Sequence, residues 1–116
     1  MLYITNIHIR YLDENMETYV FNLDFENTSR ELSKFDQELL NTFIFCVDDD
    51  LLNYLDKSTR LASEPSGWIG YDELLIMSFG ETTRMRLSFK EEYSDFSTRD
   101  IIILFNSWLN IMNRTV

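Results

Sequence analysis

The chain has 116 residues and a formal net charge of −10, from 20 acidic and 10 basic side chains. Hydrophobic residues make up 45% and aromatic residues 15%, which is enough for a core and argues against intrinsic disorder. The length predicts a single domain over residues 1–116. The negative charge argues against direct binding of nucleic acid or of anionic membranes, and it favours a basic protein partner.

Location is predicted from what the sequence lacks. Residues 1–6 have no basic region followed by an apolar region, as a signal peptide would. No apolar run approaches the roughly 20 residues of a membrane helix. Cys46 is the only cysteine, so no internal disulfide can form, which fits a reducing compartment. We therefore expect a cytoplasmic protein.

Two alternating segments open the chain. In residues 2–12, mostly apolar and aromatic side chains fall on one face and polar side chains fall on the other. The mostly apolar face consists of Tyr3, Thr5, Ile7, Ile9 and Tyr11. Residues 17–25 alternate in the same way, and turn-type residues lie between the two segments. This pattern predicts an antiparallel hairpin.

Helix signals follow the hairpin. Thr28 and Glu31 have the spacing of a capping box, and an apolar stripe continues to Phe43. Asp48 then has the position of an N-cap for a short helix through Leu55, although one long helix kinked near Asp48 fits as well.

The second half repeats this order. Pro65 marks a loop over residues 63–67, and strands are predicted over 68–79 and 84–90, joined by a turn at Gly80. Residues 91–96 are predicted to be a polar link, and Ser97 to cap a final amphipathic helix. The order ββα(α)ββα predicts an α+β fold: an antiparallel sheet built from two hairpins, with helices packed on one face.

The acidic residues are concentrated in residues 13–50, which hold 11 of the 20 acids and 2 of the 10 bases. A solvated face and a patch complementary to a cationic partner explain this equally well. The candidate partner-binding residues combine the acids with two aromatics beside the Pro65 loop: Asp36, Glu38, Asp48, Asp49, Asp50, Trp68 and Tyr71.

Catalytic and metal-binding motifs are not recognisable. The residues after Asp50 do not continue an EF-hand pattern, and zinc-ligand spacing, nucleophile motifs and phosphate loops are absent. His8 and Cys46 are predicted to be a strand-surface residue and a core residue rather than a catalytic pair. We therefore expect no enzyme activity, no metal and no cofactor. The basic row of Arg84, Arg86 and Lys90 is expected to pair with acids within the chain rather than with RNA.

In size, acidity and α+β layout the chain resembles the immunity proteins of bacterial polymorphic-toxin systems, including those of contact-dependent growth inhibition. The resemblance covers the whole chain as a profile and transfers no residue roles. It implies a small cytoplasmic protein that binds and blocks a cognate toxin domain, often a basic nuclease. Two alternatives are a phage-encoded acidic inhibitor or nucleic-acid mimic directed at a host nucleic-acid-binding protein, and a small ligand-binding domain.

Overall fold

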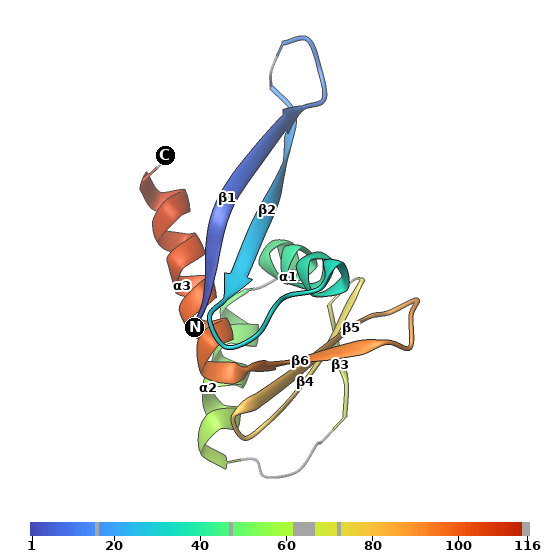
Figure 1. The fold of residues 1–116 in the computed structure, drawn as a ribbon, viewed down its shortest axis with the longest axis vertical. Helices are drawn as coiled ribbons and strands as arrows, with labels where there is room; N and C mark the ends of the chain where they lie inside the picture. Colours follow the sequence, from blue (N-terminus) through green and yellow to red (C-terminus); the bar gives the residue numbers. More distant parts are fainter. Residues whose placement is uncertain (16, 47, 62–66, 72, 115–116) are drawn as a thin grey trace.

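A computed structural model describes residues 1–15, 17–46, 48–61, 67–71 and 73–114, without the side chains of 58–61, 71 and 113–114. The elements are, in chain order, β1 (Leu2–Tyr11), β2 (Tyr19–Asn27), α1 (Lys34–Cys46), α2 (Asp49–Leu61), β3 (Ile69–Tyr71), β4 (Leu74–Phe79), β5 (Thr82–Leu87), β6 (Tyr93–Ser97) and α3 (Thr98–Arg114) (Figure 1). The predicted α+β class is confirmed.

The strands form two antiparallel sheets rather than one. The first sheet is the β1–β2 hairpin, and the second has the strand order β3-β4-β5-β6. The strand predicted over residues 68–79 divides into β3 and β4, and most of β6 lies in the segment predicted to be a polar link. β6 was not predicted because it is an edge strand in which only Phe96 is a buried hydrophobic residue. Apolar and polar residues therefore alternate only weakly along it.

The core lies between the four-stranded sheet, the three helices and the base of the β1–β2 hairpin. α1 and α2 pack against β4, while α3 packs against β5 and β6. The sheet contributes alternate residues of β4 and β5 to this core, namely Leu74, Ile76, Met85 and Leu87. The helices contribute Leu39, Leu40, Phe43, Leu51, Leu55, Ile101, Leu104 and Phe105. Among the helices of the described part of the chain, none is long and apolar enough to cross a membrane.

Two predicted helix starts are confirmed. The Asp48 carboxylate accepts a hydrogen bond from the backbone of Leu51 (2.8 Å), and α2 begins at the next residue. Ser97 Oγ accepts a hydrogen bond from the backbone of Asp100 (3.4 Å) where α3 begins. Since α1 ends at Cys46, Asp48 is not helical and α2 starts at Asp49, the alternative of one long helix kinked near Asp48 is wrong.

The predicted start of α1 is also wrong. The capping box is formed by Ser33 and Asp36 instead of Thr28 and Glu31: Ser33 N–H donates to the Asp36 carboxylate (2.8 Å), and Asp36 N–H donates to Ser33 Oγ (3.1 Å). Both pairs have the required spacing. The second pair is used because Thr28 still belongs to the end of the hairpin, where its N–H donates to the carbonyl of Met1 (2.9 Å).

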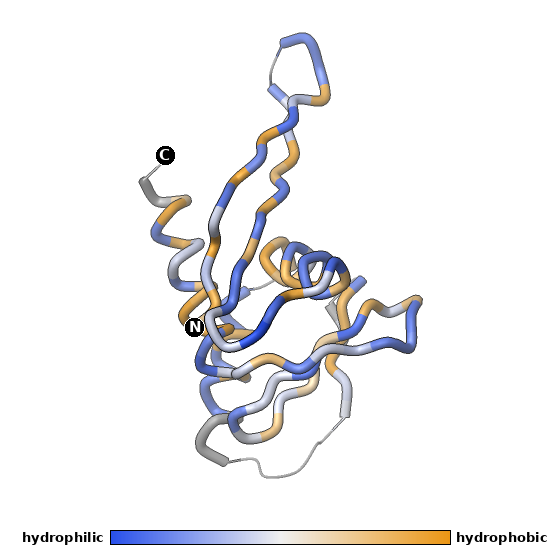
Figure 2. Tube along the Cα trace, in the orientation of Figure 1, coloured by the Kyte–Doolittle hydropathy of each residue, from blue (hydrophilic) through white to orange (hydrophobic). Residues whose placement is uncertain are grey.

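The β1–β2 hairpin projects from the body and gives the molecule extents of 50 × 30 × 29 Å (Figure 1). A register shift between Ile4 and Asn6 makes Thr5 a bulge in β1. Figure 2 shows that alternation of apolar and polar residues continues along both strands into the projecting part.

The bulge corrects the predicted face of β1. Cross-strand pairing places Ile4 beside Phe25 before the bulge and Ile7 beside Leu23 after it, so the inner face changes from even to odd positions. Tyr3 lies on the opposite face, where its hydroxyl donates to Glu26 (2.9 Å). The predicted grouping of Tyr3 with Ile7 is therefore wrong.

Candidate functional site: an apolar groove beneath the hairpin

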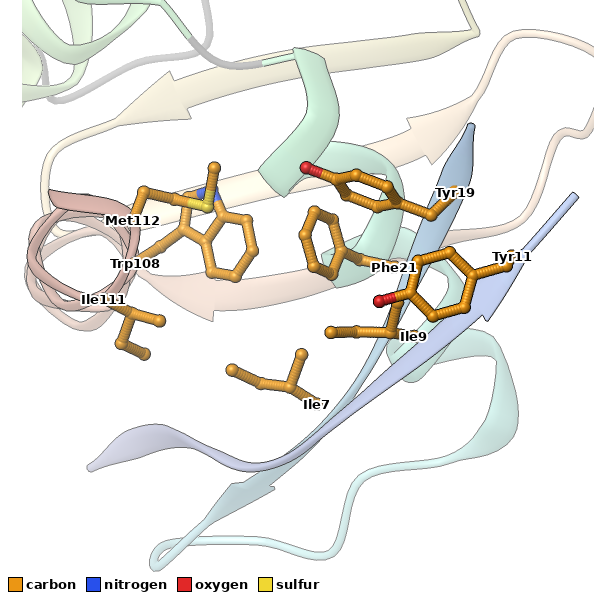
Figure 3. Close-up of a pocket in the computed structure, with 8 residues that line it drawn as sticks. All are labelled: Ile7, Ile9, Tyr11, Tyr19, Phe21, Trp108, Ile111 and Met112. Atoms are coloured by element: carbon orange, nitrogen blue, oxygen red, sulfur yellow. The ribbon is translucent and has the colours of Figure 1, made fainter. Parts of the chain in front are cut away.

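An apolar hollow of about 440 Å³ lies between the projecting part of the hairpin, residues 7–15 and 17–21, and the C-terminal half of α3. Figure 3 shows its lining side chains facing one another from the two elements: Ile7, Ile9, Tyr11, Tyr19, Phe21, Trp108, Ile111 and Met112. Ile9 is 51% exposed and Tyr19 is 48% exposed. Clustered apolar exposure of this kind is typical of an interaction surface.

The local sequence explains both walls of the groove. On the hairpin, the bulge at Thr5 sets odd-numbered residues of β1 on the same face as Tyr19 and Phe21. On α3, Trp108, Ile111 and Met112 have helical i, i+3, i+4 spacing and so share one face. These three residues continue the stripe of Ile101 and Phe105 by two turns, along α3 where it lies beside β1 (Figure 1).

A chain of aromatic contacts crosses the groove. Ring centroids lie 6.0 Å apart for Tyr11 and Tyr19, 5.1 Å for Tyr19 and Phe21, and 5.8 Å for Phe21 and Trp108. All three pairs are edge-to-face, a favourable geometry for aromatic rings. Since Trp108 is buried, it fixes the position of Phe21 and connects the exposed tyrosines to the body.

The turn above the groove is acidic. The Asp13 carboxylate accepts hydrogen bonds from the backbone of Glu17 (3.0 Å) and Thr18 (3.5 Å), so it shapes the turn. Glu14 and Glu17 are exposed at the same turn. The groove therefore has an apolar wall and a negative upper rim.

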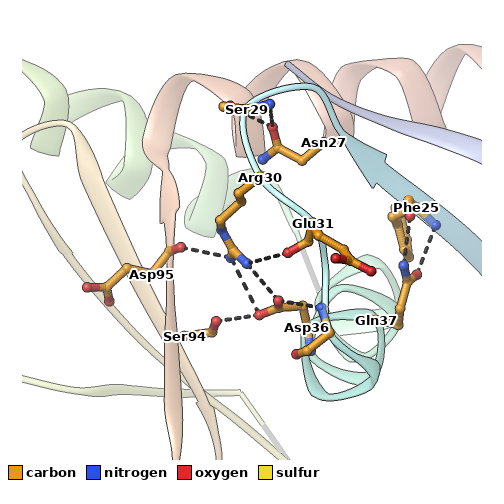
Figure 4. Close-up of polar contacts among 10 residues, drawn as sticks. Phe25, Asn27, Ser29, Arg30, Glu31, Asp36, Gln37, Ser94 and Asp95 are labelled. Atoms are coloured by element: carbon orange, nitrogen blue, oxygen red, sulfur yellow. Dashed lines mark hydrogen bonds and ion pairs between the residues drawn. The ribbon is translucent and has the colours of Figure 1, made fainter.

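Side chains of α1 cover part of the outer edge of β2. Asn41 Nδ2 donates to the carbonyl of Leu23 (2.9 Å) while its Oδ1 accepts from Leu23 N–H (2.8 Å). Gln37 bonds Phe25 in the same two ways, at 2.7 and 2.9 Å (Figure 4). Each amide thus provides the donor and the acceptor that a neighbouring strand would provide.

The spacing of these amides matches the strand. Gln37 and Asn41 are four residues apart on a helix, a rise of about 6 Å. Leu23 and Phe25 are two residues apart on a strand, a rise of about 6.8 Å. Sequence reasoning missed this arrangement, and the available signal was the i, i+4 pair of amides, Gln37 and Asn41, within a predicted helix.

Asp36, a predicted partner-binding residue, is only 3% exposed and belongs to the fold. Its carboxylate accepts hydrogen bonds from Arg30 Nη1 (2.7 Å), Ser94 Oγ and Ser33 N–H (2.8 Å), which join α1 to β6 (Figure 4). Burial raises the pKa of Asp36, but the hydrogen bonds from Arg30, Ser94 and Ser33 outweigh it, so the pKa lies below the ordinary value. The Asp36 carboxylate is thus occupied by contacts within the fold.

The other predicted acids lie in two places. Glu38 is exposed in the second turn of α1, with Lys90 Nζ 3.9 Å from its carboxylate. Asp49 and Asp50 are exposed in the first turn of α2, and Asp48 caps that helix. Cys46 is eight residues after Glu38 in α1, a rise of about 12 Å, so the structure separates Glu38 from the aspartate run. Their role in partner binding stays a prediction.

The outer face of the four-stranded sheet carries two residues of the basic row, Arg84 and Arg86, and Trp68 lies beside Arg86. The guanidinium of Arg86 lies 5.2 Å from the Trp68 ring centroid, and that of Arg84 lies 4.1 Å from the Tyr93 ring centroid. Arg84 also donates to both carboxylate oxygens of Asp95, at 2.7 and 3.0 Å. The predicted pairing of this row within the chain is confirmed for Arg84. The side chain of Tyr71, the other aromatic candidate, lies outside the described residues.

The single histidine and the single cysteine occupy different parts of the surface. His8 Nε2 lies 2.8 Å from the Asp24 carboxylate on the hairpin face opposite the groove. Cys46, at the end of α1, lines a separate hollow with Asn41, Thr42, Phe45 and Glu73. The described residues contain no group of three or more histidine, cysteine, aspartate or glutamate side chains placed to hold a metal ion.

Comparison of the chain with protein-family models, with curated proteins and with solved structures found no match. The groove and the charge of the chain are therefore the observations that bear on function.

Proposed function

We propose that this chain is an immunity protein that binds and blocks a basic toxin domain in the cytoplasm. The observation that carries the proposal is the apolar groove with its acidic rim. An exposed wall of isoleucine and tyrosine on a buried tryptophan has the composition of a protein-binding hot spot. The net charge of −10 favours a cationic partner and speeds its approach.

In the proposed mechanism the two parts of the site act at different stages. Glu14 and Glu17 attract the basic partner over several ångströms, because Coulomb attraction acts beyond contact distance. Apolar side chains of the partner then displace water from the groove and contact Ile9 and Tyr19. Inhibition follows from steric blockage, and the chain acts by binding rather than by catalysis.

The test is co-expression with the product of the gene immediately upstream. We expect the chain to restore growth of cells that produce this protein, and to co-purify with it. If the chain neither restores growth nor co-purifies, the proposed function is wrong.

A matched pair of variants assigns the interface. Ile9→Glu places a charge in the groove, whereas Val20→Glu places it on the opposite face of the same hairpin, where Val20 is 43% exposed. We expect Ile9→Glu to weaken binding of the toxin by at least about 30-fold, and Val20→Glu not to weaken it. Equal effects of the two variants would contradict the assignment of the groove.

A second pair separates the acidic regions. The double variant Glu14→Gln, Glu17→Gln is expected to slow association and to reduce its dependence on salt. The triple variant Asp48→Asn, Asp49→Asn, Asp50→Asn tests the region predicted from sequence in the same way. Stopped-flow association rates at several salt concentrations measure both, and unchanged kinetics for a variant remove those residues from the interface.

A further inference from the structure

The outer edge of β2 changes character along its length. Leu12 N–H donates to the carbonyl of Thr18 (2.7 Å), which makes this pair a hydrogen-bonded pair of the hairpin. Hydrogen-bonded and non-hydrogen-bonded pairs alternate along an antiparallel ladder. Tyr19 and Phe21 are therefore non-hydrogen-bonded with respect to β1, and their N–H and C=O groups point outward, as those of Leu23 do.

The amides of α1 satisfy this edge only at its base. They bond Leu23 and Phe25, as described above. The next residue along the stripe, four after Asn41, is Phe45, whose side chain has no hydrogen-bonding atom and is 56% exposed. α1 thus occupies the position of a third strand beside the base of β2, and no described residue hydrogen-bonds the outward backbone groups of Tyr19 and Phe21.

We propose that the partner enters as an extended strand that pairs with β2 at Tyr19 and Phe21, continuing the row of bonds begun by Asn41 and Gln37. The inference rests on the proposed function and specifies the partner's chemistry. Side chains next to Tyr19 and Phe21 on the groove face must be apolar, since that face is apolar. The remaining side chains are basic, because Glu14 and Glu17 lie at the adjoining turn.

A partner that adds as a strand and a partner that inserts a helix into the groove use their own backbone N–H groups differently. In an added strand, alternate N–H groups bond β2 and the others point to solvent. In a helix, every interior N–H is bonded within the peptide. Methylation of alternate backbone nitrogens in a peptide probe distinguishes the two.

The probe is an acetylated peptide of seven residues with alternating lysine and valine, added at millimolar concentration to the chain labelled with ¹⁵N. We expect NMR shifts at the amides of Tyr19 and Phe21. N-methylation of one alternate set of peptide residues should abolish these shifts, and N-methylation of the other set should leave them. If N-methylation of the valines abolishes the shifts, the peptide adds antiparallel to β2; if N-methylation of the lysines abolishes them, it adds parallel. The reason is that only one of the two sets of peptide N–H groups points toward β2 in each arrangement.

A pair of protein variants tests the same bond from the other side. Tyr19→Pro and Tyr19→Ala both remove the phenol ring, but only proline removes the outward N–H, and Tyr19 is the first residue of β2, where proline is tolerated. We expect the peptide to bind Tyr19→Pro about fivefold more weakly than Tyr19→Ala.

Several outcomes would overturn strand addition. They are equal effects of the two methylated sets, shifts at Ile9 and Tyr11 of β1 instead, absence of any shift, or the same shifts arising from protein concentration alone through a second copy. These results are independent of the growth test. If the chain restores growth but no strand is added to β2, the immunity function holds and the toxin binds in another way. If a strand is added to β2 but growth is not restored, the immunity function is wrong and only the binding of a strand at this edge holds.

Discussion

The base and the projecting part of the hairpin have the same alternating sequence pattern and opposite surroundings. At the base, Leu2, Leu23 and Phe25 are fully buried, and α1 covers the outer edge of β2. In the projecting part, Ile9, Tyr11 and Tyr19 are about half exposed around an open groove. Alternation therefore shows which residues share a face on each side of the bulge, while the packing of α1 and α3 against the hairpin decides how much of that face becomes core.

The largest expected effect contrasts one aromatic residue from each part. Phe25→Ala should lower the free energy of unfolding by about 3–5 kcal/mol, because it leaves a cavity in a packed core. Tyr19→Ala should lower it by no more than about 1 kcal/mol, because the ring is half exposed. Urea denaturation measures both. Similar losses for the two variants would mean that the projecting part is structurally continuous with the core.

An intermediate effect concerns the edge amides. Asn41→Leu should cost about 1–3 kcal/mol, since the N–H and C=O of Leu23 lose their partners in a partly buried position. Asn53→Leu is the matched control, because Asn53 is exposed in α2. Denaturant unfolding compares the two, and an equal cost would show that Asn41 does not stabilise the base of the hairpin.

The smallest expected effect is the pH dependence of the body. A lowered pKa means that the Asp36 carboxylate stabilises the fold in full above the pKa of an unfolded aspartate, about 3.9. This contribution is lost as the pH falls through the lower pKa of the folded state. Asp36→Asn should therefore destabilise the chain by about 1–2 kcal/mol at pH 7 and flatten its stability below pH 4. Thermal unfolding between pH 2 and pH 7 provides the measurement; an unchanged profile would remove Asp36 as the cause.

The features that were predictable from the sequence depend on local signals. The helix starts at Asp48 and Ser97 follow from capping chemistry, and the hairpin follows from period-two alternation. The division into two sheets and the bulge at Thr5 depend on tertiary packing, which leaves little trace in the order of residue types.

The candidate site was harder to predict than the fold. Charge drew attention to Asp36, yet an aspartate that is exposed and one that is bonded to Arg30 look alike in sequence. Tyr19 and Trp108 were recognisable as apolar members of a strand and a helix. That they line one groove follows only from the relative placement of elements that are far apart in the chain.

The bulge at Thr5 has a consequence for how the protein can change. Before the bulge, the even-numbered residue Ile4 is on the face that packs on the core. After the bulge, the odd-numbered residues are on the inner face, and Ile9 lines the groove. Substitutions at exposed groove positions of β1 beyond Thr5, such as Ile9 and Tyr11, thus alter the surface offered to a partner without altering the packing that holds the fold together. Related chains could differ in binding specificity while conserving one core, so variation among homologues should rise sharply at this residue.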